Sequence, residues 1–389
     1  MTHGARRRVA VFFGGRSAEH EISILSARFI VQSLDRDRYE PVLVGIDKRG
    51  RWHLQDESKL MAGPADARQV AIDETGPLVS LRPYAEPTDE APTALVRHDG
   101  ALLPVDVAFP ILHGPMGEDG CMQGLFELAQ LPYVGSGVLG CAVGMDKDLQ
   151  RRALRQAELP VVPSVTLNRR QWQRHVDGGA DDGGEGSAAS EDPVAECEEL
   201  GFPLFVKPAN MGSSLGVSRA RDRSGLVAAI AHAFEFDTKV VVERGLDHPR
   251  EIECAVLGNE DPRVSEPGEI AVTHADGFYS YDAKYLDPDG ARLIIPAELH
   301  QQERTTVQLI ALQAFRCLDG AGMARVDMFL TKDHEIYVNE VNTIPGFTAI
   351  SMYPQLFAHS GVPAVELVSE LVELGLERGN TRAQLRSDR

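Results

Sequence analysis

The sequence predicts an α/β protein, α+β in parts, with an open parallel sheet in its N-terminal domain. Residues 9–13 form an apolar run that Gly14 ends, and residues 22–30 then carry apolar side chains at helical spacing. Residues 105–112 form a second, almost continuous apolar run, which is typical of a strand that a parallel sheet buries on both faces. The order of strand, glycine turn, helix and strand therefore favours a layered fold.

The composition indicates a folded protein of several domains. The chain has 389 residues, of which 43% are hydrophobic and 25% charged, and domains commonly run to roughly 100–200 residues. Acidic residues outnumber basic ones by 58 to 39, and the net charge of −19 argues against nucleic acid or an anionic membrane as a partner. No apolar run approaches the roughly 20 residues of a membrane span. The five cysteines are widely spaced, without a C-x-x-C pair, which indicates reduced thiols and a cytoplasmic protein.

The elements predicted for the first part of the chain end just before Met145. Residues 39–46 are predicted as a second strand, and a helix is expected to begin near Cys121. Residues 55–104 have weak periodicity and predict only peripheral strands and loops. With a second boundary near Val242, the predicted domains are residues 1–144, 145–241 and 242–389.

The predicted central domain contains a glycine- and serine-rich loop. Predicted strands at residues 203–207 and 216–220 flank the sequence PANMGSSLG, whereas a Walker or Rossmann loop leads from a strand into a helix. This loop is either a flexible hairpin or a flap that covers phosphates. Lys207 at its base favours phosphate, because a lysine at the end of a strand needs an anion. Residues 177–192 are rich in Gly, Asp and Ser and predict a mobile insertion without a catalytic role.

The C-terminal part carries a candidate metal site on a predicted hairpin. Glu340 and Asn342 share one face of the predicted strand at residues 335–342. Asp327 joins them if its own strand pairs with this one. Oxygen donors without sulfur or imidazole suit a hard cation such as Mg²⁺. The alternative is an ordinary strand edge with an exposed glutamate and a turn.

Further candidates lie where predicted elements begin or end. His113 follows a predicted parallel strand at the edge where α/β sheets bind ligands, although a hydrogen-bonded turn histidine is an equal alternative. Glu19 lies near the start of the first helix. There its carboxylate either binds a ligand or only interacts favourably with the helix dipole. Gly346 ends the last strand and can turn its backbone N–H toward a ligand. Residues 277–290 are predicted as an ordered loop over a site, unless their aromatic residues and lysine are only surface decoration.

Seven motifs occur along almost the whole chain, namely FFGGRSAEHEIS, HGPMGEDGCMQG, MDK, VKPANMGSSLG, FYSYDAKY, ARVDMF and NEVNTIPGFT. In this order and spacing, they resemble the motifs of D-alanine–D-alanine ligases of the ATP-grasp superfamily. The resemblance implies a three-domain ATP-grasp fold, with ATP between the central and C-terminal domains, and a homodimer. It also implies ligation of two D-alanines through an acyl phosphate, for peptidoglycan precursor synthesis, with Mg²⁺ or Mn²⁺ present as two ions.

The resemblance assigns a role to each candidate residue. The metal ligands are Asp327, Glu340 and Asn342. Residues matching those that bind ATP are Lys147, Lys207, Ser214, Glu243 and Glu251, the last two in the adenine and ribose pocket. The first alanine's ammonium is bound by Glu19, with support from His113, Ser213 and Tyr285. The oxyanion is stabilised by Arg325 and the N–H of Gly346, and the second alanine's carboxylate is bound by Lys284 and Ser351.

Two features of the chain depart from the family pattern. The 177–192 run is longer and more polar than expected, and Leu215 replaces a more usual valine. The alternatives are a D-alanine–D-lactate ligase, or another ATP-grasp ligase, and a nucleotide sensor that binds ATP without ligating anything. Tyr285 occupies a position that differs in the D-lactate enzymes, so it favours the dipeptide product.

Overall fold

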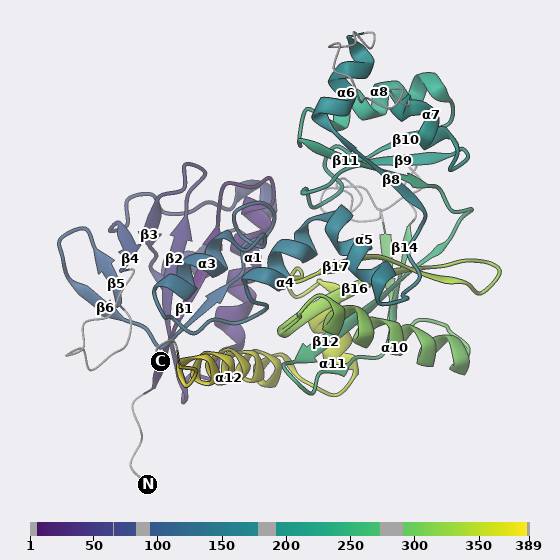
Figure 1. Ribbon diagram of the computed structural model, residues 1–389. Coiled ribbons are helices and arrows are strands. Elements are labelled where there is room, and N and C mark those ends of the chain that lie inside the picture. The colour runs from purple at the N-terminus through teal and green to yellow at the C-terminus, as the bar shows by residue number, and fades with distance from the viewer. Residues whose placement is uncertain (1–5, 65, 83–93, 178–191, 273–290, 387–389) are drawn as a thin grey trace.

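The computed structural model has four β-sheets in the part of the chain that it describes. The described residues are 6–64, 66–82, 94–177, 192–272 and 291–386. The N-terminal parallel sheet lies at the left of Figure 1, the central sheet at the upper right and the six-stranded sheet at the lower right. The mixed α/β class predicted from the sequence is therefore confirmed.

The first sheet is the predicted open parallel sheet. From edge to edge its strands are β3 (Trp52–Leu54), β2 (Tyr39–Ile46), β1 (Arg7–Gly14) and β7 (Val107–Pro110). β1 pairs in parallel with β2 and β7, while β3 is an antiparallel edge. Alternate residues of β1 enter two cores, with Val11 and Phe13 on one face and Ala10 and Phe12 on the other. This burial on both faces explains the continuous apolar run.

Helices and a small second sheet surround the parallel sheet. The helices are α1 (His20–Ser33), α2 (Glu57–Ala62), the 3-10 helix η1 (Ala67–Gln69) and α3 (Cys121–Leu128). The peripheral strands form an antiparallel sheet of β4 (Val79–Leu81), β5 (Ala94–Arg97) and β6 (Leu102–Pro104). The helix expected near Cys121 is confirmed, and it follows Gly120, whose φ of 93° suits a glycine.

The central sheet is antiparallel and has a core of its own. Its strands are β10 (Ser218–Ala220), β9 (Leu204–Pro208), β11 (Lys239–Arg244) and β8 (Ser164–Asn168). Its helices are α6 (Arg169–Val176), α7 (Pro193–Glu198) and α8 (Arg223–Ala233). The glycine-serine loop lies between β9 and β10, as predicted. Residues 178–191 of the predicted insertion lie outside the described residues.

The six-stranded sheet carries the predicted hairpin. Its strands are β15 (Ala291–Ile294), β14 (Gly268–Val272), β12 (Arg250–Gly258), β16 (Gly322–Leu330) and β17 (Ile336–Asn342), with β13 (Arg263–Val264) paired to β12. The antiparallel pair β16–β17 confirms the hairpin. The helices beside this sheet are α4 (Val138–Met145), α5 (Lys147–Gln156) and α10 (Gln301–Cys317). The sequence did not predict α4, which contains two glycines.

The last two helices, α11 (Met352–His359) and α12 (Ala364–Ala383), link the two ends of the chain. α12 runs below both the first and the six-stranded sheet in Figure 1. Its Glu373 accepts hydrogen bonds from Arg7 at 2.9 Å, from Arg38 at 2.8 Å and from Tyr39 at 2.6 Å. One hydrophobic core also contains residues of both regions. The N-terminal sheet is thereby joined to the C-terminal part.

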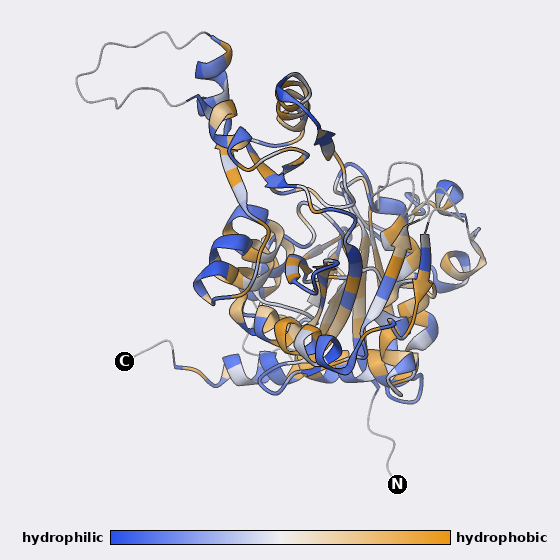
Figure 2. Cartoon of the chain, turned by 90° about the vertical axis from the view of Figure 1, so that its right-hand side faces the viewer, coloured by the Kyte–Doolittle hydropathy of each residue, from blue (hydrophilic) through white to orange (hydrophobic). Residues whose placement is uncertain are grey.

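The surface and the cysteines agree with the composition. Figure 2 shows apolar residues concentrated on interior strands and hydrophilic residues on the outer parts of helices. The cysteines are free thiols, with Cys141, Cys197 and Cys254 buried. Within the described ranges, no helix combines the length and the apolar character needed to cross a bilayer. The predicted domain boundaries stay predictions. In the structure Met145 is the last residue of α4, and Val242 lies inside β11.

Candidate functional site

A cavity of about 410 Å³ lies between the central sheet and the six-stranded sheet. Its walls come from β9 and β11 on one side and from β12, β14, β16 and β17 on the other. This volume lies within the range of roughly 300–1,000 Å³ that ligand pockets occupy. The predicted site residues that line it are Lys147, Lys207, Ser213, Ser214, Glu243, Glu251, Asp327 and Glu340.

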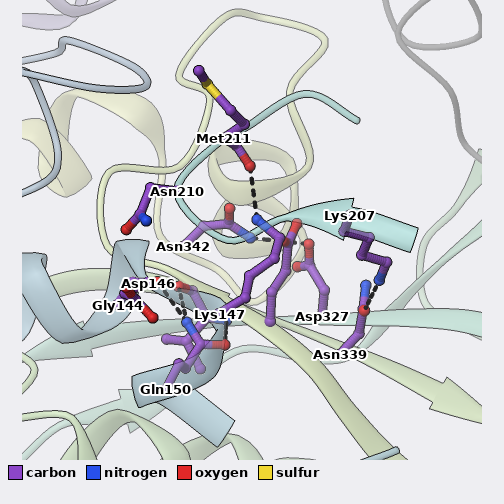
Figure 3. Close-up of polar contacts among 12 residues, drawn as sticks. Gly144, Asp146, Lys147, Gln150, Lys207, Asn210, Met211, Asp327, Asn339 and Asn342 are labelled. Carbon is purple, nitrogen blue, oxygen red and sulfur yellow. Dashed lines mark hydrogen bonds and ion pairs between the residues drawn. The ribbon is translucent and has the colours of Figure 1, made fainter. Parts of the chain in front are cut away.

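Three carboxylates lie side by side across the floor of this cavity. Glu253 on β12 is the register partner of Asp327 on β16, and Asp327 is in turn the partner of Glu340 on β17. Asn342 lies two residues further along β17, and its Nδ2 donates to Asp327 Oδ2 at 3.0 Å (Figure 3). Strand pairing therefore brings the three predicted metal ligands together. The sequence singled out Asp327 and Glu340, but it gave no role to Glu253.

The donor set fits a hard divalent cation. Asp327 and Glu340 are directly opposed carboxylates, and the Asn342 amide oxygen is a third oxygen donor on the same pair of strands. The described residues contain no group of three or more His, Cys, Asp or Glu side chains that could hold a metal ion. A site here therefore depends on Asn342 as well as on the carboxylates.

Arg325 is held between two of the carboxylates. Its Nε and Nη2 donate to Asp327 at 2.7 and 2.6 Å, and its Nε lies 3.0 Å from Glu253 Oε2. Burial alone would lower the pKa of Arg325, but the Asp327 and Glu253 carboxylates raise it well above its usual value. Arg325 therefore presents a permanent positive charge beside the predicted metal ligands, which suits its predicted role in oxyanion stabilisation.

Two lysines face the carboxylates from the other elements. Lys147 Nζ donates to the Met211 carbonyl at 2.7 Å and lies 3.7 Å from Glu340 Oε2, and Lys207 Nζ donates to Asn339 Oδ1 at 3.2 Å (Figure 3). Burial lowers the pKa of Lys147, and the Glu340 carboxylate opposes this shift only in part. Two lysines at one end of a cavity have the chemistry that phosphate oxygens require, and the phosphate role of Lys147 and Lys207 stays a prediction.

Glu243 is part of this charge network. It is 3% exposed, it accepts a hydrogen bond from Arg151, and its Oε2 lies 2.8 Å from Lys207 Nζ. Burial raises the pKa of Glu243, but Arg151 and Lys207 outweigh this effect and hold the pKa below its usual value. Glu243 is therefore ionised at neutral pH and fixes Lys207. Glu251 lines the cavity as well. Their predicted contacts with adenine and ribose remain a prediction.

The loop after β9 reaches from the cavity to the N-terminal sheet. Ser213 and Ser214 adopt left-handed conformations with φ of 51° and 58°, and Ser213 Oγ donates to Glu19 Oε1. Glu19 stands at the N-cap position of α1 but makes no side-chain capping bond. Glu19 therefore has a contact far along the chain in addition to its place at the start of α1, and its ligand role stays a prediction.

His113 lies beyond the carboxyl end of β7, as the sequence predicted. Its Nδ1 is 3.1 Å from the Ile344 carbonyl and its Nε2 is 3.5 Å from Ser26 Oγ. Burial lowers the pKa of His113 below its usual value, against the opposing effect of Glu19. The ring is therefore neutral at pH 7 and hydrogen-bonded, as the turn alternative predicted. It also lies within the electrostatic influence of Glu19, as a binding role requires.

The turn after β17 contains the last candidates. Ser351 Oγ accepts from the Thr348 N–H at 2.9 Å, and a Cβ added at Gly346 would lie 3.2 Å from this oxygen. The turn is therefore closed by Ser351, with Gly346 beside it. The remaining predicted residues, Lys284 and Tyr285, lie outside the described residues.

Sequence reasoning also missed Glu118, although it lies inside the HGPMGEDGCMQG motif. Glu118 Oε1 accepts from the Gly114 N–H at 2.7 Å. A Cβ added at Gly212 would lie 2.8 Å from Glu19 Oε2 and 3.9 Å from Glu118 Oε1, so both carboxylates face this glycine. Burial, with the nearby Glu19, raises the pKa of Glu118 to about 8. Only its place in the motif could have drawn attention to it.

Comparisons with known proteins agree with this geometry. The family model described as D-ala D-ala ligase N-terminus matches residues 8–136, and the one described as D-ala D-ala ligase C-terminus matches residues 153–373. The chain is 48% identical to the D-alanine–D-alanine ligase A of Chromobacterium violaceum, over 96% of each chain.

Two solved structures are similar over nearly the whole chain. The D-alanine–D-alanine ligase of Coxiella burnetii is 33% identical, with a TM-score of 0.78, over 97% of this chain and 98% of its own. The VanG D-Ala:D-Ser ligase of Enterococcus faecalis is 31% identical, with a TM-score of 0.79, over 95% of this chain and 100% of its own.

Proposed function

We propose, because this chain belongs to the D-alanine–D-alanine ligase family, that it uses ATP to join two D-alanines into D-alanyl-D-alanine for peptidoglycan precursor synthesis. The ATP-grasp fold implied by the motifs is confirmed by the solved relatives. The observation that carries the proposal is the row of carboxylates across β12, β16 and β17, which faces two lysines over one cavity. Such a row is suited to phosphoryl transfer, where charge must be neutralised and atoms held in line.

ATP is proposed to occupy the cavity between the two sheets. Lys147 and Lys207 would contact its phosphates, and the loop containing Ser214 would lie beside them. Glu243 and Glu251, on the central and six-stranded sheets, would contribute to the adenine and ribose end. The support is that all five residues line the same cavity.

The proposed metal ligands are Asp327, Glu340 and Asn342. These residues would hold Mg²⁺ or Mn²⁺, as two ions, whose positive charge would offset the negative charge of the ATP phosphates when bound. Asp327 is paired with Arg325 and Asn342, so its oxygens already have one partner that carries positive charge and one that donates a hydrogen bond. If a cation took the place of these partners, Arg325 would keep its ion pair with Glu253.

In the first proposed step, a carboxylate oxygen of one D-alanine attacks the γ-phosphorus of ATP, and ADP leaves. Glu19 would accept hydrogen bonds from the ammonium of this alanine, and the hydrogen bond from Ser213 that holds its carboxylate supports this role. His113, close to Glu19, would support it as a neutral ring. Tyr285 is included in this network by the family resemblance only.

In the second proposed step, the free amine of the other D-alanine attacks the acyl carbon, and inorganic phosphate leaves. Arg325 and the N–H of Gly346 would stabilise the oxyanion of the tetrahedral intermediate. Ser351 beside Gly346, together with Lys284, would bind the carboxylate of the second alanine. Exclusion of water from the closed site would protect the acyl phosphate.

The direct test is the product. Purified protein with ATP, Mg²⁺ and D-alanine is expected to release ADP and to form D-alanyl-D-alanine, measured by mass spectrometry. Adding D-lactate or D-serine in competition separates the related ligases, and exclusive formation of a mixed product would overturn the proposal. ATP binding without turnover of any small amino acid would instead support a nucleotide sensor.

Two wider aspects of the proposal concern the cell and the assembly. The free thiols and the use of ATP support a cytoplasmic location, and the net charge of −19 supports the absence of a nucleic-acid or membrane partner. The homodimer rests on the family resemblance. Light scattering of the purified protein tests it, and a monomer at all concentrations would contradict it.

A further inference from the structure

Gln150 is a buried side chain of α5 that bonds to the backbone of the metal-site strand. Its Nε2 donates to the Val341 carbonyl at 3.2 Å, and its Oε1 accepts from the Val341 N–H at 3.1 Å. The same Nε2 donates to the Gly144 carbonyl at 2.6 Å, as Figure 3 shows. Gln150 is 1% exposed. All polar atoms of the carboxamide therefore serve to hold β17 against the end of α4.

Val341 is the residue between two proposed metal ligands. Its side chain is buried in the core of the six-stranded sheet, so the neighbouring side chains of Glu340 and Asn342 emerge on the opposite face. Fixing the peptide groups of Val341 therefore fixes the backbone from which both ligands project.

β17 needs such a partner because it is an edge strand in the described part of the sheet. An edge strand has N–H and C=O groups without a neighbouring strand. Beside it, the Pro160 carbonyl accepts from the Val338 N–H at 2.8 Å. At Val341 the Gln150 carboxamide supplies both a donor and an acceptor, so it takes the place of one peptide group of a missing strand.

Neighbouring residues of α5 contact the same short segment. Lys147 and Arg151 lie three residues before and one after Gln150, a spacing that places all three on one helix face. Lys147 is 3.7 Å from Glu340, and Arg151 Nη2 donates to the Asn339 carbonyl at 3.5 Å. The ladder shifts register after Asp327, which leaves Asn339 without a partner on β16. α5 therefore holds β17 where its pairing with β16 is irregular.

We propose that Gln150 is a positioning residue for the metal site, which sets the backbone of β17 so that Glu340 and Asn342 meet one cation together with Asp327. This inference rests on the proposed metal role of those three residues. Gln150 touches neither the cation nor the substrates, and it acts through the peptide groups of Val341.

The test is the Mn²⁺ affinity of the full-length Gln150→Met variant in the presence of ADP, measured as free Mn²⁺ by electron paramagnetic resonance. Methionine keeps the length of the side chain but removes all three hydrogen bonds, the two to Val341 and the one to the Gly144 carbonyl. Loss of outer partners of metal ligands commonly weakens binding by roughly 10–100-fold, so about 10-fold weaker Mn²⁺ binding is expected. The KM for D-alanine at saturating metal should change little.

Two controls separate positioning from general destabilisation. Gln156→Met makes the same substitution on the exposed side of α5, and Val307→Ala removes buried methyl groups from the same core. Both should keep the Mn²⁺ affinity of the unchanged protein, although Val307→Ala lowers the thermal unfolding midpoint. If Gln150→Met does not fold, Gln150→Glu takes its place, because it keeps an acceptor for the Val341 N–H.

The outcomes distinguish this inference from the proposed function. Unchanged Mn²⁺ affinity in the folded Gln150 variant, with a loss in Glu340→Gln, would overturn the role of Gln150 alone. Unchanged affinity in Glu340→Gln would overturn the metal site itself. Equal losses in Gln150→Met and Val307→Ala would also overturn the inference, because they would make the effect a general consequence of stability.

Discussion

The two ends of the candidate site are built in different ways. The metal end stands on paired strands, where Glu253, Asp327 and Glu340 occupy neighbouring register positions. The other end depends on a loop, in which Ser213 takes a left-handed conformation and reaches Glu19 of the N-terminal part.

This difference shows which contacts set the geometry at each end. On the strands, backbone pairing of residues 325–330 with residues 336–342, with a register shift after Asp327, places the carboxylates, so a substitution of one carboxylate should leave the others in place. In the loop, single contacts such as Lys147 with the Met211 carbonyl hold the chain. Substitutions in the loop should therefore alter alanine binding more than metal binding.

The largest effect is expected from Glu340→Gln at the metal end. Losing outer partners of metal ligands already costs roughly 10–100-fold, so losing a direct ligand should lower Mg²⁺-dependent turnover by at least about 100-fold. Circular dichroism should remain that of the folded protein. Glu335→Gln, at an exposed residue just before the same strand, is the matched control. Near-normal turnover of Glu340→Gln would remove Glu340 from the metal site.

A smaller effect is expected from Ser213→Ala at the loop end. It removes a hydrogen bond to a carboxylate, and such bonds contribute about 1.5–3 kcal/mol, the lower end of which corresponds to a fall of roughly 10-fold in kcat/KM for D-alanine. The KM for ATP should stay within about twofold, because the hydrogen bond removed is made to Glu19, the residue proposed to bind D-alanine. Ser224→Ala, at an exposed serine of α8, should change neither value. A changed KM for ATP with an unchanged kcat/KM for D-alanine would contradict the assignment of this loop to the alanine end of the site.

Gly212→Ala should have a still smaller effect on the same end. Its Cβ would lie 2.8 Å from Glu19 Oε2, so the carboxylate must shift. Overpacking of about 1 kcal/mol corresponds to about a fivefold rise in the KM for D-alanine. Gly124→Ala in α3, where the nearest atom is 4.0 Å from the added Cβ, is the control. An unchanged KM in Gly212→Ala would mean that Glu19 does not bind the first alanine in this position.

Glu118 is expected to affect stability rather than activity, through the pH dependence that it contributes to the free energy of unfolding. Its pKa rises from the usual 4.5 to about 8 on folding, so between these values the folded protein keeps a proton that the unfolded chain releases. Stability from this group therefore falls as pH rises from about 4.5 to about 8. When denaturation midpoints are measured at several pH values in this range, they should fall less with rising pH in Glu118→Gln than in the unchanged protein. Equal slopes would contradict the raised pKa, and exposed Glu196→Gln serves as control.

The sequence could predict those parts of the site that depend on local order. The alternation of side chains along a strand places Glu340 and Asn342 on one face. The short turn between this strand and that of Asp327 predicts a hairpin, and the turn sets the register that brings Asp327 near them. The contact of Ser213 with Glu19 joins residues 194 positions apart, and no local pattern encodes it. Gln150 resembles any other helical glutamine until β17 is placed beside it. Glu253 gains its position only when β12 pairs with β16.

The central claim is that the D-alanine carboxylate is phosphorylated before the peptide bond forms. The most direct measurement uses D-alanine labelled with ¹⁸O in its carboxylate, with ATP and Mg²⁺, and mass spectrometry of the inorganic phosphate released. The account predicts that each phosphate carries one ¹⁸O, because the former carboxylate oxygen leaves with the phosphoryl group. Phosphate without ¹⁸O, released while D-alanyl-D-alanine accumulates, would contradict it.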